Sequence, residues 1–411
     1  MALCARPRAG GRPLAVRAGV GLGASLLVAT TCADCAAPGV AVSTAPRATS
    51  GARVAGSAVA ARTCADETYA KMTAAQRVGQ LLMGGVPATG PSATDLRTLR
   101  TYHVGSVMLT GRSSAGISAT KRVVDGVRGQ QDTVAGRKVG LIVATDQEGG
   151  QVQVLSGPGF SAIPAALTQG TWSTTTLRDR AEGWARQLKA AGVDLDLAPV
   201  ADVVPASLGT RNGPIGRYHR EFGHTPAVVT SHSGAFAAGF REAGVMTTLK
   251  HFPGLGRVIG NTDTTANVVD QVTTAASASL EPFTSGIKAG SPFVMVSSAT
   301  YTQIDPRHPA AFSSIVIGKL LRAQEGFKGV VISDDLGQAV AVQAYTPGQR
   351  AVNFLAAGGD MVLTVKPSTV PAMVQAIKSR TANDASFRTK VGVAVHRVLT
   401  AKAGAGLLGC G

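Results

Sequence analysis

The feature that most constrains the fold is a repeated alternation, after residue 64, of short apolar runs with longer amphipathic segments. The runs have the length and composition of buried strands, and they are Leu81–Val86, Gly105–Thr110, Leu141–Thr145, Val193–Pro199, Val245–Leu249, Phe293–Val296, Gly329–Ser333 and Met361–Val365. Most precede a segment with helical periodicity, most clearly Thr176–Ala191, Pro226–Ala243, Ser313–Gln324 and Thr346–Ala357. Eight such units predict a single α/β domain, the (β/α)8 TIM barrel. A doubly wound open sheet is the alternative, but no GxGxxG motif follows the first run.

Composition agrees with a large globular domain and argues against some functions. The chain has 411 residues, of which 45% are hydrophobic, so it can bury a sizeable core. The formal net charge is +16; it is spread along the chain, and aromatic residues make up only 4%. Nucleic-acid binding requires basic clusters interleaved with aromatic residues, so we do not expect nucleic acid as a partner. We expect attraction to an anionic cell-wall polymer, with a generally arginine-rich composition as an equal alternative.

The first 35 residues have the pattern of an export signal. Four arginines precede the apolar stretch 18–31, which is short for a permanent membrane helix but typical of a signal-peptide core. We therefore expect an extracytoplasmic protein. The sequence LVATTC ends at Cys32 and resembles a lipoprotein cleavage site, so a lipid anchor at Cys32 and simple secretion are equal alternatives. Residues 36–63, rich in Ala, Gly, Ser and Thr, predict a flexible linker before a barrel over residues 64–411.

Cysteine usage fits the same compartment. Beyond the leader only Cys64 and Cys410 remain, one at each end of the expected barrel. In an oxidising compartment this placement predicts a disulfide between them, with two unpaired thiols as the alternative. The domain contains no CxxC pair and no histidine cluster with metal-ligand spacing, so we expect no metal.

Polar residues follow the predicted strands at the points where the strands end. The carboxyl ends of barrel strands open onto one face, so residues far apart in sequence converge there. The residues at these ends are Asp146, Glu148, Asp202, Arg220, Lys250, His251, Asp334 and Asp335. Paired carboxylates with cations and glycines between them are what glycoside hydrolysis needs. For a single aspartate, and for Asp335 in particular, capping of the following helix is an alternative explanation.

The motifs DQEGG, APVADV, REFG, KHFPG and SDDLG, in this order, resemble the catalytic barrel of family 3 glycoside hydrolases. The resemblance is strongest to the single-domain bacterial β-N-acetylhexosaminidases and covers about residues 68–407. It implies that Asp334 is the nucleophile of a retaining mechanism without cofactor or metal. It also implies that Asp146, Arg220, Lys250 and His251 hold the sugar.

One loop departs from the family pattern. Close relatives read KHFPGHG followed by DSH, and the last histidine, paired with the aspartate, donates the proton. Here Leu255 replaces the first histidine and Thr265 the second, and only Asp263 of the pair stays. Threonine cannot act as a general acid near neutral pH. Gln151 and Ser298 also stand where an arginine and a histidine are common.

Three alternatives for the proton donor follow. Asp263 is the first, provided that burial or a neighbouring carboxylate raises its pKa. His219 or His224 of the REFG loop is the second. In the third, the barrel binds sugar but is catalytically impaired. We expect an exported, monomeric glycosidase that cleaves β-linked N-acetylglucosaminides in cell-wall (peptidoglycan) fragments. Asp334 and Asp263 are its expected catalytic pair. A different sugar specificity is a further alternative.

Overall fold

The computed structural model describes residues 50–410, so the predicted leader, Cys32 and the first part of the linker lie outside the described residues. The central sheet has eight parallel strands, in the order β14-β11-β9-β8-β5-β2-β1-β15. Their bounds are β1 (Leu82–Pro87), β2 (Ser106–Thr110), β5 (Ile142–Thr145), β8 (Leu195–Asp196), β9 (Met246–Phe252), β11 (Phe293–Val296), β14 (Val330–Ser333) and β15 (Val362–Thr364). A parallel bridge between Ile332 and Met361 joins the two outer strands and closes the sheet. The predicted TIM barrel is therefore confirmed.

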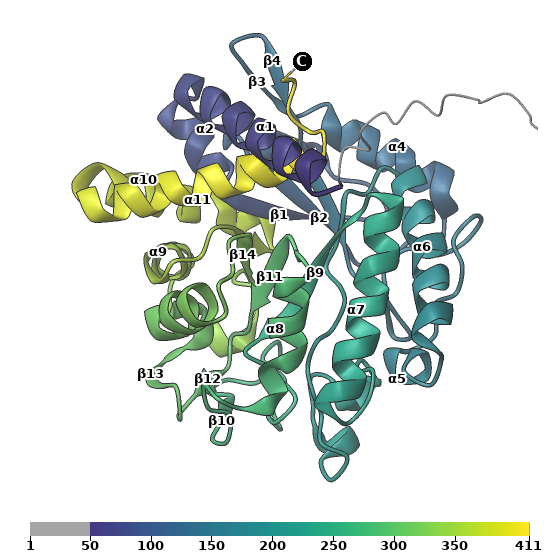
Figure 1. Cartoon of the computed structure of the whole chain (residues 1–411). Helices are drawn as coiled ribbons and strands as arrows, with labels where there is room; N and C mark the ends of the chain where they lie inside the picture. The colour runs from purple at the N-terminus through teal and green to yellow at the C-terminus, as the bar shows by residue number, and fades with distance from the viewer. Residues whose placement is uncertain (1–49, 411) are drawn as a thin grey trace, which may run out of the picture. The chain divides into compact units, whose positions relative to one another are not determined.

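Helices cover the outside of this barrel (Figure 1). They are α1 (Ser50–Lys71), α2 (Ala74–Gly79), α3 (Ala93–Thr101), α4 (Gly116–Arg128), α5 (Ala166–Gln169), α6 (Thr174–Ala190), α7 (Pro226–Ala243), α8 (Glu281–Lys288), the π-helix η5 (Ile315–Gln324), α9 (Pro347–Ala357), α10 (Val370–Asn383) and α11 (Ala385–Gly404). Short strands lie in the connections: β3 (Asp132–Val134), β4 (Arg137–Val139), β6 (Gln147–Gly149), β7 (Val152–Gln153), β10 (Val269–Asp270), β12 (Thr300–Tyr301) and β13 (Asp305–Pro309).

The sequence signals explain where individual elements begin and end. In α7 the side chain of Thr225 caps the first turn, Pro226 occupies the first helical position, and Gly244 ends the helix in the left-handed conformation. The strand predicted over Val193–Pro199 is regular only at Leu195–Asp196. We attribute this to Pro199, which has no N–H to donate to a neighbouring strand.

The core has two layers. Alternate strand residues, such as Ile142, Leu195 and Ile332, point into the barrel, while their neighbours pack against the surrounding helices. Val398 of α11 belongs to the inner cluster. Lys402 of the same helix donates to the Gly105 carbonyl just before β2. Helix α11 therefore covers the end of the barrel where the strands begin.

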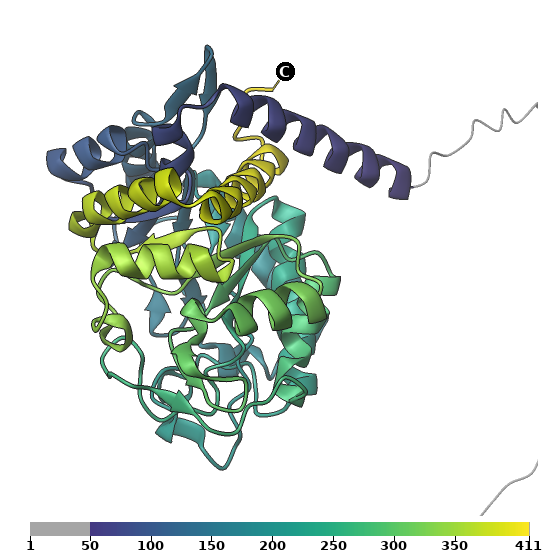
Figure 2. The ribbon, with the colours of Figure 1, turned by 90° about the vertical axis from the view of Figure 1, so that its left-hand side faces the viewer.

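The predicted flexible linker is wrong for residues 50–63, because they belong to α1. Alanine is frequent in this segment and has the highest intrinsic helix propensity. The carboxyl end of α1 also packs against α11. This packing stabilises the helix although its sequence shows no helical periodicity. Figure 2 shows α1 extending away from the barrel wall. Within residues 50–410, no helix is both long enough and apolar enough to span a membrane.

The predicted disulfide is confirmed. Cys64 of α1 and Cys410, which follows α11, are bonded, with 5.9 Å between their Cα atoms and a sequence separation of 346 residues. The bond links the second half of α1 to the segment that follows α11.

We expect replacement of both cysteines by serine to lower the free energy of unfolding by about 4 kcal/mol, because the bond restricts a very long loop in the unfolded chain. Urea denaturation of the oxidised wild type and of the Cys64→Ser, Cys410→Ser variant measures the difference. A reducing agent should lower wild-type stability and leave the variant unchanged. Two titratable thiols per chain in denatured, unreduced protein would contradict the prediction.

Candidate active site

A pocket of about 310 Å³ opens at the end of the barrel where the strands finish. Its wall contains all six residues for which the sequence predicted a role, and they are Asp146, Arg220, Lys250, His251, Asp263 and Asp334. They come from the ends of four strands, β5, β8, β9 and β14, and from the loops that follow these strands. The structure thus brings the predicted residues together, whereas their individual roles stay predictions.

The pleat of the strands explains which side chains reach the pocket. On β14, Val330 and Ile332 point into the barrel, so the next residue on that face is Asp334, directly above them. The amide of Asp334 continues the ladder by donating to the Val296 carbonyl at 3.0 Å. The same alternation places Asp146 above Ala144 on β5. A carboxylate held by a strand end has little freedom to move, as a nucleophile requires.

Asp335 also borders the pocket, but its carboxylate is occupied by backbone hydrogen bonds. Its carboxylate accepts hydrogen bonds from the backbone amides of Gly337 at 2.8 Å, Gln338 at 3.0 Å and Val365 at 2.9 Å. These bonds fix the turn that follows Asp334. The alternative that Asp335 caps the following helix is not what the structure shows, because Thr346 caps that helix and Asp335 bonds to the turn after Asp334 and to Val365.

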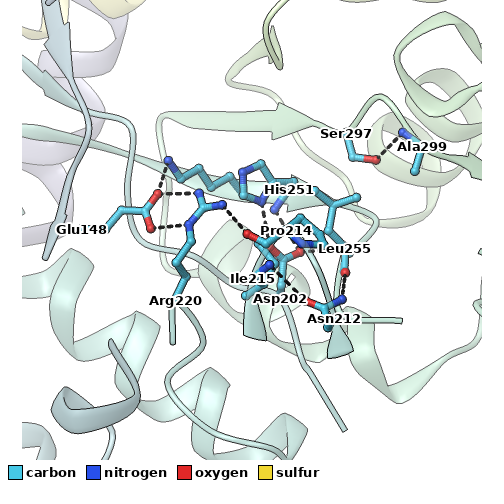
Figure 3. A network of polar contacts seen from close by, with 12 residues as sticks. Glu148, Asp202, Asn212, Pro214, Ile215, Arg220, His251, Leu255, Ser297 and Ala299 are labelled. Carbon is cyan, nitrogen blue, oxygen red and sulfur yellow. Dashed lines mark hydrogen bonds and ion pairs between the residues drawn. The ribbon is translucent and has the colours of Figure 1, made fainter. Parts of the chain in front are cut away.

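Glu148 is the centre of a buried cluster of charges on one wall. Its carboxylate accepts hydrogen bonds from Arg220, at 2.8 Å from Nε and 2.7 Å from Nη2 (Figure 3). It also lies 2.6 Å from Nζ of Lys250. Lys250 also donates to Oδ1 of Asp146 at 2.6 Å. Bidentate pairing of this kind fixes the planes of both groups. The wall therefore presents rigidly oriented donors and acceptors to an uncharged ligand.

The charges in this cluster are fixed ones. Burial raises the pKa of Glu148, but the charges of Arg220 and Lys250 outweigh it and lower that pKa from 4.5 to about 2. Burial lowers the pKa of Lys250, and the charges of Asp146 and Glu148 outweigh this effect and raise it. The pKa of Arg220 rises in the same way, mainly through Glu148. These groups therefore keep their charges and do not exchange protons near neutral pH.

His251 is oriented by Asp202. Its Nδ1 lies 2.7 Å from Oδ2 of Asp202, whose other oxygen accepts the backbone amides of His251 at 3.2 Å and Leu255 at 2.7 Å (Figure 3). Asp202 is completely buried. The bond to Nδ1 leaves Nε2 as the ring nitrogen available to a ligand in the pocket.

Asp263 lies at the mouth of the pocket on the loop after β9 and remains open to solvent on one side. Desolvation by the surrounding protein and the negative charge of Asp334 raise the pKa of Asp263 from 3.8 to about 6. The charges of Arg220 and His251 oppose this rise, and Asp335 adds to it. A carboxyl group with such a pKa carries a proton over part of the physiological pH range. A raised pKa of this kind is what Asp263 needs in order to act as the proton donor.

Thr265 and the two histidines that the sequence considered as donors lie outside the pocket. Thr265 does not reach the pocket; it lies beside Gly260 and lines a separate hollow on the outer face of the loop. The side chain at position 265 is therefore directed away from the pocket in this structure, whereas Asp263 lines it. His219 and His224 are exposed and do not line the pocket, and Nδ1 of His224 lies 3.0 Å from the Val204 carbonyl.

The sequence assigned no catalytic or substrate-binding role to Glu148, Asp202 and Asn212. The first two stand in the quoted motifs, and their positions at strand ends were the available signal. Asn212 lies in RNGP, where no periodicity or motif marks it. Among residues 50–410, no three His, Cys, Asp or Glu side chains are grouped so that they could hold a metal ion.

Comparison with known proteins identifies the family. Residues 73–401 match the family described as glycosyl hydrolase family 3 N terminal domain. The chain belongs to glycoside hydrolase family 3. A beta-hexosaminidase of Xanthomonas axonopodis pv. citri (strain 306) is 34% identical over 320 residues, which cover 76% of this chain and 91% of that protein.

Solved structures agree with this assignment. The crystal structure of a beta-N-acetylhexosaminidase from Beutenbergia cavernae DSM 12333 is 50% identical, with a TM-score of 0.79, and the match covers 80% of this chain and 98% of that one. A family 3 glycosyl hydrolase from Mycobacterium smegmatis str. MC2 155 is 28% identical, with a TM-score of 0.69, over 81% of this chain and 98% of that one. This family 3 protein is therefore a glycosidase, which hydrolyses O-glycosyl bonds of a carbohydrate substrate.

Proposed function

We propose that this family 3 glycosidase hydrolyses β-linked N-acetylglucosaminides with retention of configuration, using Asp334 as nucleophile and Asp263 as acid and base. The observation that carries the proposal is the pairing of two carboxyl groups in one pocket, of which Asp263 has a pKa raised to about 6 beside Asp334. Environments that separate the behaviour of two carboxyl groups are typical of an acid and its partner. The names of the relatives support the choice of sugar.

In the first step, a carboxylate oxygen of Asp334 attacks the anomeric carbon while the bond from that carbon to the leaving oxygen breaks. Asp263 transfers its proton to the leaving oxygen, and a glycosyl ester of Asp334 remains. In the second step, the Asp263 carboxylate takes a proton from water, and the water oxygen attacks the anomeric carbon. The ester bond breaks, which restores the Asp334 carboxylate and the protonated Asp263.

The charge cluster and His251 hold the sugar for these steps. The carboxylate of Asp146 accepts hydrogen bonds from sugar hydroxyls, while Lys250 and Arg220 donate to its oxygens. Because Glu148 fixes both cations from behind, their positions do not depend on the substrate. Preorganised donors of this type need no reorganisation when charge moves in the transition state.

We further propose that the enzyme works outside the cytoplasm, secreted or lipid-anchored at Cys32, on cell-wall fragments that contain N-acetylglucosamine. The predicted leader motivates this compartment, and the Cys64–Cys410 bond supports it because disulfides persist in oxidising environments. The net charge of +16 favours contact with anionic cell-wall polymers.

A panel of 4-nitrophenyl β-glycosides, assayed with the purified chain from residue 50 onward, tests the sugar specificity. We expect the N-acetylglucosaminide to have a kcat/KM at least about tenfold above that of the glucoside and the xyloside, because a missing hydrogen-bonding group leaves buried partners unpaired. NMR of the first sugar product should show the β-anomer. Faster cleavage of the glucoside, or an α-anomer as first product, would contradict the proposal.

A further inference from the structure

The loop that carries Asp263 is fixed on two sides, although it forms no regular secondary structure around that residue. It leaves β9 after Phe252 and returns to the barrel wall near Val268. Its neighbours are the Arg220 loop on one side and the segment after Asp334 on the other. Each neighbour makes hydrogen bonds with the backbone of this loop.

Asn212 makes the connection to the Arg220 loop. Its Nδ2 donates to the carbonyl oxygens of Leu255 at 2.7 Å and Val258 at 2.8 Å, and its Oδ1 accepts the amides of Ile215 at 3.0 Å and Gly216 at 2.8 Å. Figure 3 shows this side chain between the two segments. Asn212 is completely buried, and each of these bonds joins it to backbone. It therefore ties together the loops that carry Arg220 and Asp263.

The segment after Asp334 makes the second connection. The short 3₁₀-helix η6 (Val340–Val342) lies beside the Asp263 loop. The amide of Val340 donates to the Asp263 carbonyl at 3.2 Å, and the amide of Ala341 donates to the Thr262 carbonyl at 3.0 Å. Within the loop, the Asp263 amide donates to Oδ1 of Asn261 at 2.9 Å. The backbone of the proposed acid is thus bonded to the strand connection that carries the proposed nucleophile.

We propose that Asn212 and the amides of Val340 and Ala341 are positioning groups that hold Asp263 at its working distance from Asp334 before substrate binds. This inference rests on the proposed function of Asp263 as proton donor. Proton transfer requires a donor within hydrogen-bond reach of the leaving oxygen. A displacement of about 1 Å in an active site costs on the order of 100-fold in rate. A loop bonded on both sides avoids this loss without a closing motion.

Val340→Pro tests the second connection and changes little else. It removes the N–H that bonds to the Asp263 carbonyl, and proline is well tolerated at the first position of a helical turn. Ala339, with φ −56° and ψ 127°, already has the extended conformation that a residue before proline adopts. Val340→Ala, which keeps the amide and shortens the half-exposed side chain, is the reference variant.

We expect Val340→Pro to lower kcat for methyl β-N-acetylglucosaminide by about tenfold or more relative to Val340→Ala, because an alcohol cannot leave without a proton. With the 2,4-dinitrophenyl glycoside, whose leaving group needs no proton, the rate of glycosyl-ester formation, measured from the burst or from kcat/KM, should agree between the two variants within about twofold. A thermal denaturation midpoint within a few degrees of the reference shows that the fold is retained. An equal loss with both substrates, or no loss with either, would overturn the inference.

Asn212→Asp tests the first connection. The carboxylate keeps an acceptor for Ile215 and Gly216 but cannot donate to Leu255 and Val258 unless it is protonated. We expect the same selective loss of turnover with the methyl glycoside as in Val340→Pro. An equal loss of rate with the methyl and the 2,4-dinitrophenyl glycoside would overturn the role of Asn212. Asp263→Asn, assayed alongside, separates the two levels of argument. If Asp263→Asn leaves turnover of the methyl glycoside unchanged, the proposed function fails. If Asp263→Asn lowers this turnover but the two positioning variants do not, only the present inference fails.

Discussion

Replacement of Asp334 by asparagine should reduce turnover of every substrate that the wild type cleaves by about 10⁴-fold or more, as expected when a catalytic nucleophile is lost. The side-chain amide has nearly the same shape, so the pocket should be unchanged, but it cannot form the glycosyl ester. The loss should be the same for good and poor leaving groups, because both steps pass through that ester. Steady-state kinetics with an aryl and an alkyl glycoside measure it.

Asp335→Asn is the matched control for this prediction. Its carboxylate is bonded to three backbone amides, so the amide variant places an NH2 group against at least one N–H. We expect a loss of about 1–3 kcal/mol in the free energy of unfolding and a smaller effect on turnover. Thermal denaturation of both variants separates the two effects. If Asp335→Asn abolished turnover while Asp334→Asn retained it, the nucleophile would be assigned to the wrong residue.

Asp263→Asn should show the second largest effect, and this effect should depend on the leaving group. We expect kcat/KM for an alkyl glycoside or a disaccharide to fall by about 10²–10⁴-fold, the usual contribution of general acid catalysis. Formation of the glycosyl ester from a 2,4-dinitrophenyl glycoside should be nearly unaffected, because this phenolate departs without a proton. Burst and steady-state kinetics with the two substrate classes measure the contrast.

The pH dependence gives an independent test of the same residue. The acid must be protonated to act, and burial together with Asp334 raises the pKa of Asp263 to about 6. Wild-type kcat/KM for the alkyl glycoside should therefore be highest below about pH 6 and fall as pH rises through that value. In Asp263→Asn this falling limb should disappear. An unchanged pH profile in the variant would exclude Asp263 as the donor. Thr265→His should not restore a donor, because residue 265 faces the outer hollow.

The barrel and most of the site were predictable because both follow from local patterns. Buried strands appear as apolar runs, and the residue that follows each run on the inner face is fixed by the alternation of the pleat, as for Ile332 and Asp334. The five motifs then determined which strand ends carry chemistry. Nothing in this reasoning required knowledge of how distant segments pack.

The features that the sequence did not reveal depend on such packing. Hydrogen bonds that Asn212 and η6 make with the loop determine whether Asp263 or Thr265 faces the pocket. Such bonds between distant segments leave no repeating pattern in the sequence. The role of Asn212 exists only where two loops meet. Helix α1 was missed for a similar reason, since its packing against α11 and the bond at Cys64 stabilise a segment whose composition suggested a linker.

The placement of α1 and α11 determines how the enzyme can be approached. Both helices and the Cys64–Cys410 bond lie at the end of the barrel where the strands begin, while the loops after the strands, with β10, β12 and β13, lie at the other end (Figures 1 and 2). Immobilisation through the start of α1 would therefore leave the pocket facing away from the support. A carbohydrate substrate can then reach the pocket from the surroundings, with the whole depth of the barrel as a spacer.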